Sequence, residues 1–423
     1  MPDAGQTRDV SLPGSKSIAA RALILSEVYK DAILIGRLPD CDDTEELAQA
    51  LRQFDKSEPG GTYNLGTGGT SLRFFLALAA SWPGFEGVID CAAPLKRRPL
   101  GPLVDALRAA GADIECLERE GHAPMRVRGR VLDGTGVRVA SGVSSQYASA
   151  MLMVSPLWKH PFVIEGDAGV SRPYLDMTAR MIQEISSVTE PRLYYIESDW
   201  SAASYFYELA LLSPDRDIML DSLVPEGESL QGDSACERIF RQLGVETVYP
   251  DEGGAILRGS REAIEGLRLP ESGPVVLDLN GTPDLVPALA VGLCMTGIRF
   301  RFEGIGHLRH KESDRLAVLR EELGKAGFEV RDSEDSLEWT GGRCPTDAYV
   351  EFDSHGDHRI AMAFSVAAAV RGAVVINGAE AVEKSFRSFY DQLEGVGFKV
   401  KYDAPNKRST QRGEMDSILP LFD

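Results

Sequence analysis

The stretch LVDALRAAGADIECL, residues 103–117, carries the pattern on which the fold prediction rests. Its apolar residues recur every three or four positions as far as Ala110, which predicts an amphipathic helix. Gly111 follows, where a residue without a Cβ most easily adopts the left-handed conformation that ends a helix. Beyond the glycine the apolar residues alternate, as in a β-strand. The stretch therefore predicts one helix–glycine–strand unit.

The same order recurs along the chain. Clear copies begin at Glu237 (ERIFRQLGVETVYP), Leu316 (LAVLREELGKAGFEVR) and Phe389 (FYDQLEGVGFKVKY), and weaker copies at Thr44 (TEELAQALRQFD) and Met177 (MTARMIQEISSV). Repeated helix–strand units are typical of α/β proteins in which helices pack on sheets. The capping glycines are unevenly spaced, which argues against a solenoid. Because 423 residues are too many for one compact core, we predict two similar domains.

The composition disfavours several classes of protein. Acidic residues outnumber basic ones by 64 to 45, and the formal charge of -19 argues against a broad nucleic-acid or anionic-membrane surface. The six cysteines include no C-x-x-C pair, which indicates reduced thiols rather than disulfides or a zinc site. The N-terminus lacks the apolar core of a signal peptide, and the apolar stretch 288–298 is too short to span a bilayer. We therefore expect a cytoplasmic protein with no membrane or nucleic-acid partner.

Within this acidic chain, cations lie at or near several predicted helix starts. They are Lys16, Arg21, Arg98, Arg172, Lys311, Arg315, Arg359 and Lys384. Helix N-termini offer free N–H groups and the positive end of a dipole. If these helix ends converge, they form a pocket for small, multiply anionic ligands. Taken singly, each segment also fits a plain capped helix or a solvated charge.

Uncharged residues at other helix starts support the same interpretation. The loop LGTGGTSLR from Leu65 places Gly69 before an apolar helix, where backbone N–H groups can approach an anion closely. The Ser-Ser-Gln run 144–146 leads another helix, and Ser171 and Tyr174 flank a third helix start. Serine hydroxyls beside free N–H groups are typical of phosphate-binding turns, although they also serve as ordinary helix caps.

Two carboxyl groups are candidates for proton transfer. Asp284 lies between a strand and an apolar helix, where it either caps the helix or, facing cations, acts as a general base. Glu312 adjoins Lys311 at a predicted helix start. Because Lys311 and Arg315 are four residues apart, we expect them to share a helical face with an anion between them. The polar trio 357–359 precedes an almost wholly apolar helix, which favours a functional role.

Ten motifs in this order resemble the family of 3-phosphoshikimate 1-carboxyvinyltransferases, also called 5-enolpyruvylshikimate-3-phosphate synthases. The motifs cover nearly the whole chain and are LPGSKSIAARAL, GTGGTSLR, RRPLGPLVDAL, SSQYASAMLM, SRPYLDMT, SDWSAASYF, PDLVPALA, KESDRL, DHRIAMAF and EKSF. The resemblance implies an α/β fold of two pseudo-symmetric domains, each of three βαβαββ-like units in an inside-out α/β barrel. It places residues 14–197 in the first domain and residues 1–13 plus 198–423 in the second, so that the chain crosses twice.

The resemblance also implies a reaction in the shikimate pathway of aromatic amino acid and chorismate biosynthesis. The family transfers the enolpyruvyl group of phosphoenolpyruvate to the 5-hydroxyl of shikimate 3-phosphate through a tetrahedral adduct and releases phosphate. Asp284 would accept the hydroxyl proton, while Glu312, with Lys311 nearby, would protonate the phosphoenolpyruvate methylene. Lys16 is the fourth expected catalytic residue. Closure of the two domains would exclude water, and we expect a monomer that needs neither a cofactor nor a metal.

Motif matching assigns the binding residues to the two substrates. Shikimate 3-phosphate would be held by Lys16, Ser17, Arg21, Ser144, Ser145, Gln146, Ser171, Tyr174, Asp284, His307 and Lys311. Phosphoenolpyruvate would be held by Lys16, Gly69, Arg98, Gln146, Arg315, Arg359 and Lys384. Glyphosate occupies the phosphoenolpyruvate site in this family, so we expect it to inhibit, because Gly69 leaves room where a methyl group would crowd it.

This chain departs from the family pattern at several positions. The usual N-A-G-T loop begins here with Thr67, and a proline common a few residues later is Phe74. An asparagine that usually binds shikimate 3-phosphate is His307. The segment after Pro405 is polar and then ends in SILPLFD, which fits either a loose end or a docking segment.

Three other functions stay open. The UDP-N-acetylglucosamine enolpyruvyl transferases share fold and donor but carry a reactive cysteine in a C-x-x-G-x-R-P loop. Here Cys91 stands seven residues before Arg98 with no glycine between them. A catalytically inactive binder of the same fold is disfavoured because the expected catalytic residues are retained. A metal protein would use the pairs His307-x-x-His310 and His355-x-x-His358 as ligands.

Overall fold

The computed structural model describes residues 8–30, 33–36, 38–55, 60–140, 145–165, 172–346, 349–402 and 415–420. Ser144 and Ser171, both expected to bind shikimate 3-phosphate, lie outside these residues. The chain divides into two compact units. The first unit comprises Gly14–Glu197 with Leu230–Gly232, and the second comprises Met1–Pro13, Ser198–Ser229 and Asp233–Asp423.

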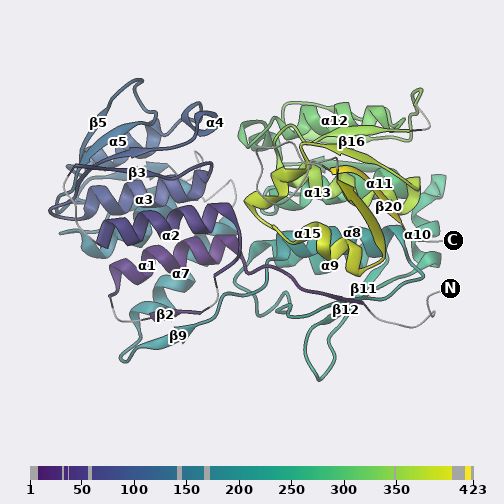
Figure 1. Ribbon diagram of the computed structural model, residues 1–423, viewed down its shortest axis with the longest axis horizontal. Coiled ribbons are helices and arrows are strands. Elements are labelled where there is room, and N and C mark those ends of the chain that lie inside the picture. Colours follow the sequence, from purple (N-terminus) through teal and green to yellow (C-terminus); the bar gives the residue numbers. More distant parts are fainter. Residues whose placement is uncertain are drawn as a thin grey trace. The chain divides into compact units, whose positions relative to one another are not determined.

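The first unit contains three sheets and the helices that follow their strands (Figure 1). The strands are β2 (Ile33–Ile35) with β9 (Arg192–Tyr194), then β3 (Gly61–Asn64), β4 (Glu86–Asp90), β6 (Met125–Arg128) and β5 (Asp113–Cys116), and finally β7 (Arg138–Ala140) with β8 (Val163–Glu165). The helices are α1 (Lys16–Val28), α2 (Asp42–Asp55), α3 (Gly69–Ser81), α4 (Ala93–Lys96), α5 (Gly101–Ala109), α6 (Ser145–Val154), the 3₁₀ helix η1 (Ser155–Leu157) and α7 (Arg172–Ser186).

The second unit repeats this plan with two four-stranded sheets and two strand pairs. The strands are β1 (Arg8–Val10), β10 (Ile218–Leu220), β12 (Ala255–Gly259) and β11 (Val245–Val248), then β13 (Val275–Asp278), β14 (Phe300–Glu303), β16 (Ser336–Trp339) and β15 (Arg331–Asp332), and the pairs β17 (Glu351–Asp353) with β18 (Val375–Asn377) and β19 (Phe398–Tyr402) with β20 (Met415–Pro420). The α-helices are α8 (Trp200–Leu212), α9 (Ala235–Gln242), α10 (Arg261–Arg268), α11 (Val286–Thr296), α12 (Arg315–Lys325), α13 (His358–Val366), α14 (Ala368–Arg371) and α15 (Phe389–Gly395). The 3₁₀ helices are η2 (Gly232–Ser234), η3 (Pro270–Ser272), η4 (Pro283–Leu285), η5 (Gly306–His310) and η6 (Ala379–Lys384).

The three four-stranded sheets share one strand arrangement. In each sheet the first two strands are parallel and the other neighbours are antiparallel, in the orders β3-β4-β6-β5, β13-β14-β16-β15 and β1-β10-β12-β11. The third of these sheets takes its first strand from the N-terminus, where Arg8 pairs with Ile218. The recurrence confirms the predicted α/β class with pseudo-symmetric repeats.

The helix–glycine–strand pattern is also confirmed. The glycines of the four clear copies all have positive φ, for example 100° at Gly111 and 98° at Gly397. A side chain there would be strained, which is why glycine marks these helix ends. The four clear copies correspond to α5 with β5, α9 with β11, α12 with β15, and α15 with β19.

The core of each unit is built around helices that are apolar on nearly all sides. In the second unit every residue of α8 and α13 is buried, and α11 is buried except at Met295. In the first unit α3 is buried at all residues except Thr70, and it packs against α6 and α1. A helix with no polar face must be enclosed by other elements, so only its ends can carry charged residues at little cost.

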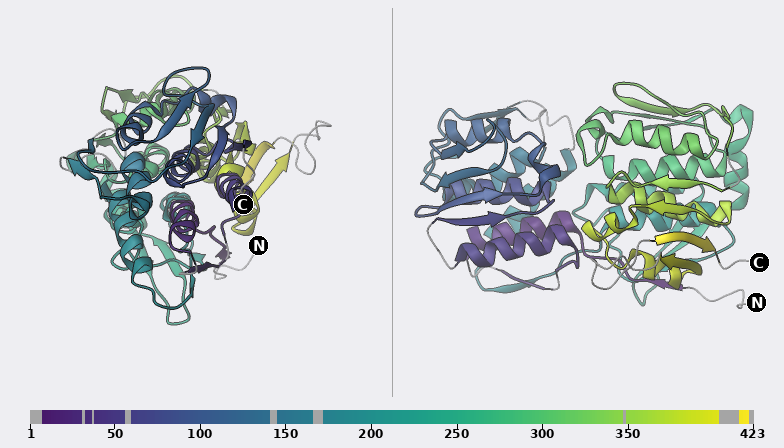
Figure 2. Two further views of the ribbon diagram at one scale, coloured as in Figure 1. Left: turned by 90° about the vertical axis from the view of Figure 1, so that its left-hand side faces the viewer. Right: turned by 45° about the horizontal axis from the view of Figure 1, so that its top comes forward.

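The segment near the C-terminus forms a strand. The yellow strands β19 and β20 run side by side in both views of Figure 2, with Phe398 opposite Pro420 in an antiparallel ladder. No helix within the described ranges is long and apolar enough to cross a bilayer.

One buried acid lies within an apolar helix rather than at its end. Glu208 lies in the middle of α8 with no exposed surface, and neither of its carboxyl oxygens has a hydrogen-bond partner among the described residues. It packs closely over α11, because a Cβ built at Gly292 would lie 3.2 Å from Glu208 Cγ. Burial raises the pKa of Glu208 well above its usual value, so the carboxyl is neutral in the folded protein.

Replacing this carboxyl by an amide should stabilise the protein at neutral pH. A raised folded-state pKa gives stability that is present below the unfolded pKa and is lost as the pH rises, because the unfolded chain ionises first. We expect Glu208→Gln to increase the free energy of unfolding by about 1–3 kcal/mol at pH 7, and by much less at pH 4. Denaturant unfolding at both pH values measures this difference. An equal effect at the two pH values would contradict a neutral Glu208.

Candidate active site

In the first unit, the start of α1 carries an ion pair between a partly buried lysine and a buried aspartate. Ser15 caps the helix by accepting a hydrogen bond from the backbone N–H of Ile18, which fixes Lys16 and Ser17 in the first turn. Lys16 Nζ lies 2.8 Å from an oxygen of Asp43, near the start of α2. The Asp43 side chain is only 6% exposed, so this pair holds the ammonium group at the helix end.

Arg21, one turn further along α1, is buried and bonded within the protein. Its Nε donates to Thr178 Oγ1 at 2.7 Å, and its Nη atoms donate to the backbone oxygens of Ser17 and Tyr174 at 2.8 and 3.1 Å. These acceptors are uncharged, and burial lowers the pKa of Arg21 to about 10. Arg21 therefore links α1 to the start of α7 through these uncharged acceptors.

The glycine loop before α3 brings two more arginines together. The Nη1 atoms of Arg98 and Arg73 would each lie 2.8 Å from a Cβ built at Gly69, and Arg73 donates to the Gly69 backbone oxygen at 2.7 Å. Both guanidinium groups thus lie against Gly69 because it lacks a side chain. The structure therefore brings together Gly69 and Arg98, both expected to bind phosphoenolpyruvate.

The start of α6 lies next to the same loop region. Tyr147 donates to the backbone oxygen of Pro99, and Arg73 lies 5.4 Å from the centre of the Tyr147 ring. Ser145 is buried at the helix start, and Gln146 is partly buried. By contrast, Arg172 is exposed and pairs with Asp176 on the surface of α7.

In the second unit, one buried guanidinium connects three carboxyl groups. Arg315 begins α12 and is 1% exposed. Its nitrogens lie 2.9 Å from Asp284, 3.1 Å from Glu312 and 2.8 Å from Asp357, and each carboxyl comes from a different loop or helix start. The carboxylates raise the pKa of Arg315 above its usual value even though burial opposes this. The planar fork of arginine is suited to several acceptors in one plane.

Each proposed proton-transfer carboxyl has a second cation. Arg359 Nη2 lies 2.7 Å from Asp284 Oδ2, the oxygen opposite the one that Arg315 contacts, and Lys384 Nζ lies 3.0 Å from Glu312. Asp357 caps α13 by accepting a hydrogen bond from the backbone N–H of Arg359, which sets the direction of that side chain. The structure thus brings Asp284, Glu312, Arg315, Arg359 and Lys384 into one ionic cluster.

Charge and burial act in opposite directions on the two groups nearest the centre of this cluster. Burial opposes ionisation of Asp284, but Arg359, Lys311 and Arg315 outweigh it and hold the pKa of Asp284 well below its usual value. Burial is also the main cause that lowers the pKa of Lys311, partly offset by the negative charge of Asp284. The cluster therefore contains an ionised aspartate beside a lysine that releases its proton more readily than usual.

Comparison with known proteins identifies the family. A sequence profile described as EPSP synthase (3-phosphoshikimate 1-carboxyvinyltransferase) matches residues 3–393. The 3-phosphoshikimate 1-carboxyvinyltransferase of Bacteroides fragilis is 36% identical over 410 residues, which cover 93% of this chain and 96% of the relative. That of Methanopyrus kandleri is 36% identical over 390 residues, covering 87% and 86%.

The chain belongs to the EPSP synthase family. The crystal structure of the EPSP synthase from Acinetobacter baumannii superposes with a TM-score of 0.65 at 21% identity, over 92% of this chain and 95% of that one. The chain therefore shares the fold of that EPSP synthase.

This EPSP synthase family member also contains buried polar groups that were not among the predicted site residues. Asp233 lies in η2 and accepts a hydrogen bond from Ser201 at the start of α8. Burial and the negative charge of Asp284 raise the pKa of Asp233 to about 7. Tyr205 lies fully buried beside Arg359, and burial raises its pKa. The available signal for Tyr205 and Arg73 was their place within the motifs SDWSAASYF and GTGGTSLR.

Two local expectations for this EPSP synthase family member are wrong. Lys311 and Arg315 do not share a helical face, because α12 begins only at Arg315 with Asp314 as its cap. The anions next to Arg315 are protein carboxyl groups, whose nearness cannot be read from spacing along one helix. Lys384 ends the 3₁₀ helix η6 and does not begin a helix.

The structure gives little support to a metal site at the two histidine pairs. Among the described residues, the one group with three possible ligand atoms close together is Glu321, Glu322 and His355. Neither His307 and His310 nor His355 and His358 contribute two ligands to such a group.

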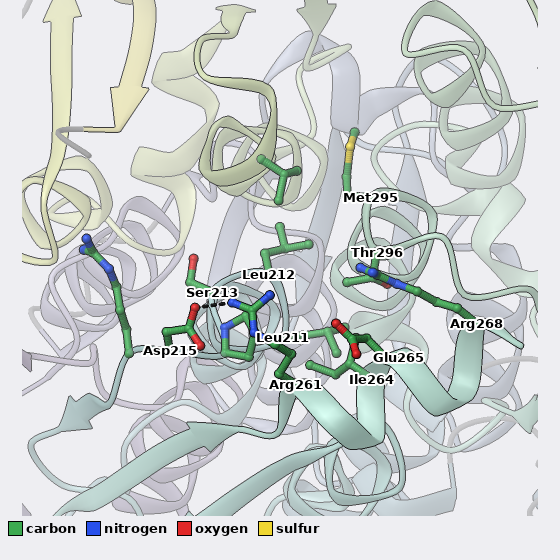
Figure 3. Close-up of a pocket in the computed structure, with 13 residues that line it drawn as sticks. Leu211, Leu212, Ser213, Asp215, Arg261, Ile264, Glu265, Arg268, Met295 and Thr296 are labelled. Carbon is green, nitrogen blue, oxygen red and sulfur yellow. Dashed lines mark hydrogen bonds and ion pairs between the residues drawn. The ribbon is translucent and has the colours of Figure 1, made fainter. Parts of the chain in front are cut away.

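The second unit also has a cavity of about 260 Å³ that contains none of the predicted site residues. Its floor is apolar, with Leu211, Leu212 and Ile264, and Figure 3 shows Arg261 reaching across to form an ion pair with Asp215. Because none of the predicted site residues lines this cavity, we place the candidate site at the ionic cluster.

His307, the family member's replacement for asparagine, lies in this cluster. Burial and the charge of Lys311 lower the pKa of His307 to about 4. Its Nε2 atom is shielded from solvent and has no hydrogen-bond partner among the described residues. At neutral pH the ring is therefore uncharged, like the amide that it replaces.

Titration by NMR should show this directly. We expect the His307 ring signals, assigned with a His307→Gln variant, to titrate near pH 4. In Lys311→Met the midpoint should rise, because a positive neighbour has been removed. A midpoint near 6.5 in the native protein would contradict burial of the ring beside Lys311.

Proposed function

We propose that the chain transfers the enolpyruvyl group of phosphoenolpyruvate to the 5-hydroxyl of shikimate 3-phosphate and releases phosphate. The observation that carries the proposal is the buried Arg315, which lies between Asp284 and Glu312, each also bonded to a further cation. Two ionisable acids at fixed positions among cations provide the acid–base pair and the anion-binding groups that this reaction needs. Relatives named 3-phosphoshikimate 1-carboxyvinyltransferase support this activity.

In the proposed addition step, Asp284 accepts the proton of the substrate hydroxyl. Its low pKa keeps it ionised at neutral pH, which is the form that a base requires. The hydroxyl oxygen bonds to C2 of phosphoenolpyruvate while Glu312, assisted by Lys311, delivers a proton to the methylene carbon. The adduct then loses phosphate as the methyl group returns a proton, which regenerates the enol ether.

The cations act on the adduct through charge. Arg315, Arg359 and Lys384 lie within hydrogen-bonding distance of the acid–base pair. Phosphate and carboxylate groups held there bring negative charge next to the carbon that reacts. Stabilising the adduct more than the separate substrates lowers the barrier.

The remaining binding roles are assigned to residues of both units. We propose that Lys16, Gly69, Arg98 and Gln146 bind phosphoenolpyruvate, and that shikimate 3-phosphate is bound by Lys16, Ser17, Ser144, Ser145, Gln146, Ser171 and Tyr174, together with Lys311, His307 and Asp284. We also propose that Arg21 binds shikimate 3-phosphate, and its hydrogen bonds to the backbone oxygens of Ser17 and Tyr174 hold these two residues in place. We further propose that the two units are the family's domains, 14–197 and 1–13 plus 198–423, in a cytoplasmic monomer.

The function is tested by phosphate release. Purified protein should release phosphate from phosphoenolpyruvate with shikimate 3-phosphate, and not with UDP-N-acetylglucosamine as the acceptor. Asp284→Ala should keep the binding of both substrates nearly intact but lower turnover by about two to four orders of magnitude, because the base is lost. Asp278→Ala, an exposed carboxyl in the same unit, is the matched control and should stay active.

Release only with the nucleotide sugar would identify the UDP-N-acetylglucosamine enolpyruvyl transferase activity instead. Binding of both substrates without release would identify an inactive binder. Near-normal turnover of Asp284→Ala would exclude Asp284 as the base.

A methyl group at Gly69 should displace Arg98. Because the Arg98 and Arg73 nitrogens would lie only 2.8 Å from that methyl, Gly69→Ala should raise the KM for phosphoenolpyruvate by about threefold or more. Glyphosate should inhibit the native protein, and a higher concentration should be needed for Gly69→Ala. Gly101→Ala is the control, because no atom lies within 4 Å of its added Cβ. Equal KM values and equal glyphosate sensitivity in the three proteins would show that Arg98 does not bind the donor.

A further inference from the structure

A buried glutamate two turns along α12 has no role in the proposed chemistry. Glu322 lies on the helix that Arg315 begins, and its side chain is 0% exposed. Its carboxylate accepts hydrogen bonds from the backbone N–H of Asp353 at 3.0 Å, from His355 Nε2 at 2.8 Å and from Lys325 Nζ at 2.8 Å. A buried charge needs such partners, so the question is what these contacts hold in place.

The contacts hold the turn between β17 and α13. Asp353 is the last residue of β17, and the turn leads directly to Asp357, the cap of α13. His355 has a φ of 50°, the only positive φ at a non-glycine residue among those described. A side chain in this region of φ costs about 1 kcal/mol or more, and such strain persists where surrounding contacts impose it. Here the imposed contact is the His355 ring on Glu322.

Helix α12 therefore holds the turn at two separate points. At its first residue, Arg315 bonds to Asp357, and two turns later Glu322 bonds to Asp353 and His355. One contact would leave the turn free to pivot, whereas two contacts fix both the position and the direction of the start of α13. Arg359 is the second residue of that helix, and its guanidinium reaches Asp284.

We propose that Glu322 and His355 are positioning residues that aim Arg359 and Asp357 at the ionic cluster. The kinetic part of this inference rests on the proposed function, whereas the structural part does not. The two residues do not touch the cluster themselves, so they act through the turn. Lys325 bonds both Glu322 oxygens at 2.8 Å, which favours a fixed ion-pair network over a metal ion at Glu321, Glu322 and His355.

Variants of His355 separate the ring contact from the backbone strain. His355→Gly removes the ring but makes the positive φ unstrained, so its overall stability should stay close to that of the native protein. His355→Gln returns an N–H donor near the position of Nε2 and should restore much of the effect. Glu322→Gln removes the charge within the same shape, and Glu321→Gln, on the exposed neighbouring residue, is the matched control.

The first readout is amide hydrogen exchange of residues 353–359, which needs no activity. We expect exchange to be about tenfold faster or more in His355→Gly and Glu322→Gln, but unchanged in Glu321→Gln and largely restored in His355→Gln. Native exchange rates in His355→Gly and Glu322→Gln would overturn the proposal. Protection that appears only when Zn²⁺ or Mn²⁺ is added, and that Glu321→Gln abolishes, would replace it with a metal site.

The second readout is phosphate release with phosphoenolpyruvate and shikimate 3-phosphate. We expect His355→Gly to lower kcat/KM for phosphoenolpyruvate by about tenfold or more. A small displacement of Arg359 would weaken its electrostatic stabilisation of the negatively charged adduct. If the effect passes through Arg359, it should nearly vanish in an Arg359→Lys background, whereas additive losses would overturn that route. A native protein that releases no phosphate would overturn the proposed function alone, and the exchange result would still decide the positioning role.

Discussion

The buried guanidinium of Arg315 is the interaction on which the rest of the second unit's site depends. A charge with 1% exposure must be neutralised nearby, and the carboxyl groups that do so precede α11, precede α12 and cap α13. Because α11 and α13 are almost wholly apolar, their starts are the places where acids can be tolerated. One arginine thus gathers three chain segments into a fixed cluster.

The first unit also has a buried arginine among helix starts, but with a different electrostatic result. Among the described residues, the acceptors of Arg21 are hydroxyl and backbone oxygens, and burial lowers its pKa. The carboxylates around Arg315 raise its pKa instead. A buried arginine among helix starts therefore supplies positive potential in the first unit, whereas in the second unit it lies beside an ionised Asp284. That division suits a reaction between anions that also needs proton transfer.

The sequence predicts most of the architecture because its signals are local. Helix periodicity and a following glycine identify units such as α5 with β5 without reference to the rest of the chain. The helix starts that carry Lys16, Asp284 and Arg359 are local signals too. The pairing of Lys16 with Asp43, and of Arg315 with Asp357, joins residues 27 and 42 positions apart. Such pairs depend on how the helices pack, and spacing within one segment cannot reveal them. The expected shared face of Lys311 and Arg315 failed for a local reason, because the helix begins at Arg315 rather than before Lys311.

The ion pairs of the second unit also affect the basicity of Asp284 in the proposed reaction. Arg315 and Arg359 hold the pKa of Asp284 low, which keeps it ionised but makes it a weak base. A substrate phosphate or carboxylate that engages these arginines competes for the same N–H donors and adds negative charge beside Asp284. Both effects raise its pKa toward the range in which a base is effective. Basicity would then increase only when the anionic donor is bound, which couples proton acceptance to substrate occupancy through charge alone.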